Sequence, residues 1–128
     1  MKQSLLLTIT SVLSILFMTF HLTDDIVRGF ENGGVSIPIA VPILVVWLYG
    51  ALVLAGRRSG YVITLLMSLL GSLVPVLHMT GKGVGGEIAK SSRGFFFIWT
   101  MIALGVTALI SVVLSVRGLW SLRRTTPD

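Results

Sequence analysis

The sequence has no cysteine and few charged side chains. Asp, Glu, Lys and Arg make up 12% of its 128 residues, whereas an ordinary soluble domain is about 25% charged. The absence of cysteine excludes disulfide bonds, thiolate metal sites and thiol-disulfide chemistry. The scarcity of charge, together with a mean hydropathy of +0.95, excludes a disordered chain, a water-soluble globule and a nucleic-acid-binding domain. The expected solvent of this chain is therefore a lipid bilayer.

The charged residues fall in five clusters that leave four long uncharged runs. These runs cover residues 3–23, 32–56, 59–81 and 94–116, and their lengths are 21, 25, 23 and 23 residues. A helix needs about 20 mostly apolar residues to cross a hydrocarbon core of about 30 Å, so each run holds one crossing. The sequence therefore predicts an all-α, integral membrane bundle with short loops. It forms a single domain (1–128) of four transmembrane helices, at approximately 4–30, 37–56, 60–79 and 94–117.

The first run could also be read as a secretory signal peptide, because it follows a short basic start. Around residues 19–22 there is no pair of small residues spaced as in a cleavage site. The apolar run is also longer than the usual 7 to 15 residues of a signal peptide. We therefore expect this helix to be retained.

The basic residues divide unequally between the two ends of such a bundle. Six of them lie on the side that holds both termini and four on the opposite side. The first group comprises Lys2, Arg57, Arg58, Arg117, Arg123 and Arg124. The positive-inside rule then predicts that both termini are cytoplasmic and that the chain is a multi-pass protein of the plasma (inner) membrane. Because these residues stand singly or in pairs at helix ends, we expect lipid, and no nucleic acid, as their partner.

A glycine-rich segment at 81–86 raises the question of a nucleotide site. Gly81, Gly83 and Gly86 match the spacing G-x-G-x-x-G. That motif binds phosphate only between a strand and the helix that follows it, whereas here it follows a transmembrane helix on the predicted outer side. We expect a connecting loop and no nucleotide.

The first helix carries a polar stripe. At 100° per residue, Thr10 and Ser14 lie within about 20° of His21, and Asp24, Asp25 and Arg28 continue the stripe beyond it. This face must be wet or buried in protein. Asp24 and Arg28 are four residues apart, which predicts an ion pair on the helix surface.

The last helix repeats small residues every four positions. They are Ala103, Thr107, Ser111 and Ser115. In lipid such a face lets two helix backbones approach closely. We expect it to pack against another helix, either within the chain or of a partner.

The two histidines occur in the same local context. His21 and His78 each begin an H-x-T sequence near the end of a helix that runs to the outer side. Because these two helices run parallel, both imidazoles are expected at one depth, with Asp24 and Asp25 one turn beyond His21. The predicted metal ligands are therefore His21, Asp24, Asp25 and His78, which suit a single Zn²⁺, Fe²⁺ or Cu²⁺ ion. The two histidines could instead be the axial ligands of a b-type haem, or a proton relay.

The sequence leaves three functions open. No charged residue lies in the middle of a predicted crossing, which disfavours a proton-coupled exporter, and no nucleophile lies near a base. We therefore expect a non-enzymatic accessory or interaction subunit, whose partner is another membrane protein or a second copy of this chain. It would dock through the small-residue face of the last helix. The alternatives are a metal- or haem-binding redox or metal-handling protein, and a small transporter or proton-relay protein.

Overall fold

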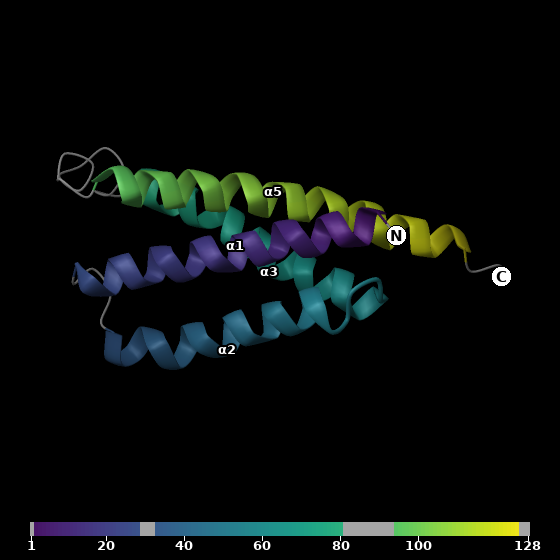
Figure 1. Cartoon of the computed structure of the whole chain (residues 1–128), viewed down its shortest axis with the longest axis horizontal. Coiled ribbons are helices and arrows are strands. Elements are labelled where there is room, and N and C mark those ends of the chain that lie inside the picture. Colours follow the sequence, from purple (N-terminus) through teal and green to yellow (C-terminus); the bar gives the residue numbers. More distant parts are fainter. Residues whose placement is uncertain (1, 29–32, 81–93, 126–128) are drawn as a thin grey trace.

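The chain folds as a bundle of long helices that lie side by side (Figure 1). The computed structural model describes residues 2–28, 33–80 and 94–125, and those residues contain four α-helices and no strand. The helices are α1 (Lys2–Val27), α2 (Gly33–Leu52), α3 (Arg58–Thr80) and α5 (Gly94–Thr125). The predicted all-helical fold is confirmed.

The helix boundaries differ from the predicted ones mainly in α2 and α5. Helix α2 begins and ends four residues earlier than predicted, and the chain then turns through Gly56, whose φ of 77° suits glycine. Helix α5 continues to Thr125 instead of ending at 117. It passes through Gly118, where the absence of a Cβ makes room for the ring of Tyr61. The predicted end of the first helix, at 30, lies outside the described residues.

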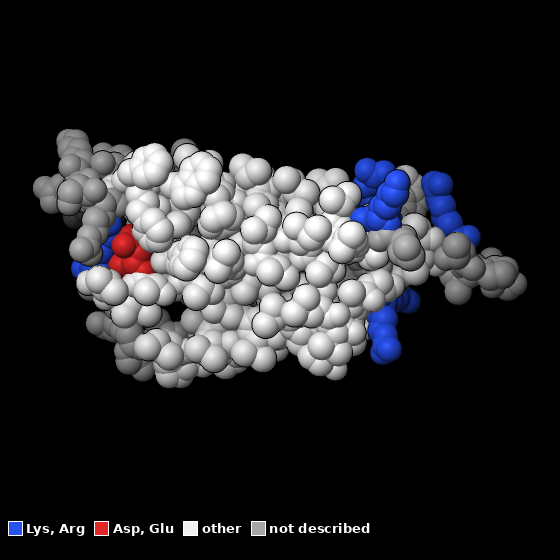
Figure 2. Space-filling view, viewed as in Figure 1, with Lys and Arg blue, Asp and Glu red and all other residues white. Residues whose placement is uncertain are grey.

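Length and composition suit three of the helices to a membrane crossing. They are the segments Lys2–Val27, Arg58–His78 and Gly94–Arg124, while the apolar part of α2, Ile37–Leu52, is shorter. Large apolar side chains stay exposed along the whole middle of the bundle. Figure 2 shows this uncharged belt, with most of the visible Lys and Arg at the end that holds both termini, and Asp beside further basic atoms near the opposite end, where Arg28 pairs with Asp24. The distribution supports a membrane bundle.

A seam of hydroxyl groups joins α1 to α5. The Ser14 hydroxyl donates to Thr107 Oγ1 at 2.9 Å, and Thr107 donates to a carbonyl of its own helix. One turn away, Ser111 donates to Thr10 Oγ1 at 2.8 Å. The polar stripe of the first helix and the small-residue face of the last one therefore face each other. In lipid, such bonds and close contacts are what hold helices together.

The small-residue face of α5 packs within the chain. Ser111 and Ser115 are fully buried, and Thr107 and Ser111 bond to α1. Of the two packing partners expected for this face, the described residues show the one within the chain.

Helix α3 packs on the other side of α5 through glycines and proline. A Cβ on Gly105 would lie 3.0 Å from Pro75, and one on Gly71 would lie 3.0 Å from the Trp47 ring. Trp47, from α2, is 1% exposed and fills the space beside α3. These contacts set the depth at which the end of α3 meets the end of α1.

Candidate functional site

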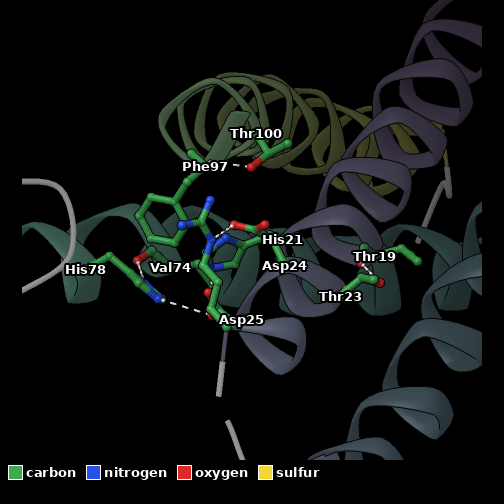
Figure 3. Close-up of polar contacts among 10 residues, drawn as sticks. Thr19, His21, Thr23, Asp24, Asp25, Val74, His78, Phe97 and Thr100 are labelled. Atoms are coloured by element: carbon green, nitrogen blue, oxygen red, sulfur yellow. Dashed lines mark hydrogen bonds and ion pairs between the residues drawn. The ribbon is translucent and has the colours of Figure 1, made fainter. Parts of the chain in front are cut away.

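Three potential metal ligands meet at the end of the bundle opposite the termini (Figure 3). His21 and Asp25 are one turn apart near the end of α1, and His78 comes from the last turn of α3. Phe97, in the first turn of α5, lies against both imidazole rings. The structure thus brings together His21, Asp25 and His78, three of the four residues predicted as ligands.

Asp25 is the centre of this cluster. Its Oδ2 lies 3.4 Å from His21 Nε2 and 3.5 Å from His78 Nε2. One donor atom from each of the three residues lies within 4.8 Å of the other two. The two rings are in edge contact, with centroids 4.7 Å apart. Two nitrogens and one carboxylate oxygen therefore point at a common space.

A backbone bond sets the tautomer of His78. Its Nδ1 lies 2.9 Å from the carbonyl oxygen of Val74, which can only accept, so Nδ1 carries the hydrogen and donates it. In the neutral ring, Nε2 then presents a lone pair toward Asp25 Oδ2. A lone pair and a carboxylate oxygen repel each other unless a proton or a metal ion lies between them. Histidines that bind metals generally have this arrangement, with one nitrogen on the metal and the other held by a carbonyl or carboxylate.

The polar side chains of this cluster are unusually deeply buried. The side chains of His21 and Asp25 are 1% and 6% exposed, while that of His78 is 30% exposed. Within the described residues, neither ring nitrogen of His21 makes a hydrogen bond. A buried polar group without a hydrogen bond costs about 1–3 kcal/mol. Metal coordination through Nε2 would offset that cost, and His78 would be the ligand nearest the surface.

Asp24, the fourth predicted ligand, points elsewhere. Its Oδ2 accepts a hydrogen bond from Arg28 Nε at 2.7 Å, so the predicted ion pair is confirmed. Asp24 is not among the residues whose donor atoms converge. The two adjacent carboxylates thus have different partners.

The separations from Asp25 Oδ2 to the two histidine nitrogens suit a small metal ion. Ligand atoms about 2.0–2.2 Å from a tetrahedral zinc ion lie roughly 3.3–3.6 Å from one another. The distances of 3.4 and 3.5 Å from Asp25 to the two rings fall in this range. Two imidazoles and one carboxylate leave at least one position of the ion for an outside ligand.

The same spacing does not fit a haem held between the histidines. Two axial imidazoles stand on opposite faces of the macrocycle, which must pass between the rings. Here the His21 and His78 rings contact each other directly, and Phe97 packs at 5.3 and 5.8 Å from their centroids. A haem would have to separate all three rings.

Sequence reasoning did not identify Phe97 as part of the site. The aromatic residues between 95 and 99 form a pattern typical of the membrane surface, and Phe95 and Trp99 are exposed. Phe97 is 1% exposed instead, because it faces the bundle. Its position between two exposed aromatics is a helical pattern that could have indicated an inward face.

Comparisons with known proteins add nothing to this geometry. No protein-family model, curated protein or solved structure matches the chain. The function must therefore be inferred from the residues themselves.

Proposed function

We propose that the chain crosses the plasma membrane four times, with both termini in the cytoplasm. Three helices are long enough to cross, and α2 runs along α1 and contacts α3 (Figure 1). The turn between α2 and α3 carries Arg57 and Arg58, at the same end as Lys2 and the arginines of α5 (Figure 2). This concentration of positive charge supports a cytoplasmic location for that end. The His/Asp cluster then faces the outside.

We further propose that the protein binds one divalent transition-metal ion through His21, Asp25 and His78. The ion would be bound and released at the outer face of the plasma membrane. The observation that carries this proposal is the position of Asp25 Oδ2 between two Nε2 atoms, at 3.4 and 3.5 Å. These ligands contain no sulfur, which favours zinc or another ion that takes nitrogen and oxygen over Cu⁺. The partly exposed His78 would allow the ion to enter and leave from outside.

The structure favours this function over the expected accessory subunit. The accessory role depended on the small-residue face of α5, which packs within the chain. The metal-handling role depends on convergence of α1 and α3 at one depth, and their donor atoms do converge. The proposed function is therefore metal binding at the membrane.

Elemental analysis by mass spectrometry tests the proposal. The full chain is purified in detergent without chelator and compared with His78→Ala, which removes a 30% exposed side chain and should not disturb folding. We expect about one metal ion per chain in the wild type and none in the variant. Asp24→Asn is the matched control, since it removes a neighbouring charge but no converging donor atom. Metal-free wild-type protein that also fails to take up added Zn²⁺ would overturn the proposal.

A further inference from the structure

A groove lies at the opposite end of the molecule, between the start of α1 and the end of α2. It holds about 370 Å³ of open space and is lined by Lys2, Ser4, Leu5, Thr8 and Ala55. Ligand pockets commonly measure about 300–1,000 Å³. The surface of the groove is mostly apolar, and Lys2 is the charged residue among those that line it.

The end of α2 explains why this space exists. Helix α2 stops at Leu52, and the chain turns away through Gly56 into α3. The Thr8 hydroxyl donates to the carbonyl oxygen of Ala51 at 3.1 Å and ties α1 to that last turn. Beyond this bond α2 does not continue beside the first turns of α1, so a groove remains next to Leu5.

The charged residues that the structure describes near the groove are all basic. Lys2 lines it, and Arg57 and Arg58 follow two and three residues after Ala55. The acidic residues that the structure describes, Asp24 and Asp25, are both at the other end of the bundle. The groove therefore combines an apolar lining with an excess of positive charge at its end.

We propose that this groove binds an anionic phospholipid, with the phosphate against the Lys2 ammonium and an acyl chain along Leu5 and Thr8. The apolar lining is what points to a lipid, because free phosphate would contact only the ammonium. The positive end of the bundle faces the leaflet that holds anionic lipids if the proposed topology is right. This site is separate from the metal cluster and does not depend on it.

Native mass spectrometry of the full chain with equimolar phosphatidylglycerol and phosphatidylcholine tests this site. We expect phosphatidylglycerol to be retained preferentially. One basic residue near an anionic membrane is worth about a fivefold change in binding, so Lys2→Gln should lower phosphatidylglycerol binding by about fivefold. Ala55→Trp should abolish it by filling the groove without changing charge. Both positions are exposed, so both variants should fold.

The matched control is Arg124→Gln, which removes a charge at the same end but outside the groove, where Arg124 lies 4.6 Å over the Trp120 ring. It should bind phosphatidylglycerol as the wild type does. Equal losses in Lys2→Gln and Arg124→Gln would overturn the proposal in favour of a general basic surface. Unchanged binding by Ala55→Trp, or displacement of the lipid by excess inorganic phosphate, would also overturn it. The metal content of all three variants should equal that of the wild type.

Discussion

Asp25→Asn should separate metal binding from the stability of the bundle. The substitution keeps the shape of the side chain but removes its charge, and Asp25 Oδ2 is the atom that contacts both imidazoles. Loss of a group that only supports a metal ligand typically costs 10–100-fold in affinity. Loss of a direct ligand should lower the affinity by more than the upper end of that range. We therefore expect zinc affinity to fall by at least about 100-fold, which is about 2.7 kcal/mol.

The metal-free protein should respond differently to the same change. Asp25 is 4% exposed, and transferring a charged carboxylate from water into the protein interior costs free energy. Without metal, Asp25→Asn should therefore be at least as stable as the wild type. Zinc at 100 times its Kd should stabilise the wild type by about 2.7 kcal/mol and should not stabilise the variant. Affinity can be measured by competition with a chromogenic chelator, and stability by tryptophan fluorescence during unfolding in detergent.

Asp24→Asn is the control, because it changes the neighbouring carboxylate, which pairs with Arg28. Its zinc affinity should stay within about tenfold of the wild type. Equal losses of affinity in the two variants would refute a specific role of Asp25. A large loss of stability in metal-free Asp25→Asn would instead indicate that protonated histidines pair with the carboxylate, and that no metal is needed.

Three further predictions concern the bundle and its orientation. Gly118→Val places carbons where the Tyr61 ring packs and should destabilise the fold by about 1–3 kcal/mol, measured by unfolding in a denaturing detergent. An unchanged transition would contradict the packing of α3 on α5. Ser111→Ala removes one bond between helices and should cost only about 0.6 kcal/mol in the same assay. Since the chain has no cysteine, a single Arg58→Cys can report orientation, and an impermeant thiol reagent should label it only after the cells are opened.

The composition and the charge spacing were enough to predict the helices. Uncharged runs of 21 to 25 residues leave few structures other than long apolar helices, because backbone groups in lipid must be hydrogen-bonded internally. The positions at which the helices end were less predictable. Helix α5 continues past Gly118, which packs against the ring of Tyr61, far away in sequence, and no local pattern indicates that contact.

The candidate site was only partly predictable for a similar reason. Helical spacing placed His21, Asp24 and Asp25 on neighbouring faces of one helix, but their directions differ by 100° per residue. Which carboxylate meets His78 depends on how α1 is rotated about its axis. The bonds from Ser14 to Thr107 and from Ser111 to Thr10 set that rotation. They bury Asp25 with the histidines and leave Asp24 to Arg28.

The helical and apolar character of this protein, the approximate positions of its helices, and the placement of two histidines and two aspartates near helix ends all follow from the sequence. Those properties follow from local composition and periodicity, which act within a single segment. Packing between the helices, by contrast, brings α1 and α3 together at one depth, puts Asp25 and not Asp24 in the cluster, and uses the small-residue face of α5 inside the chain. These outcomes depend on side-chain packing between segments far apart in sequence, and in a bilayer such packing, not burial from water, selects the neighbours of each helix.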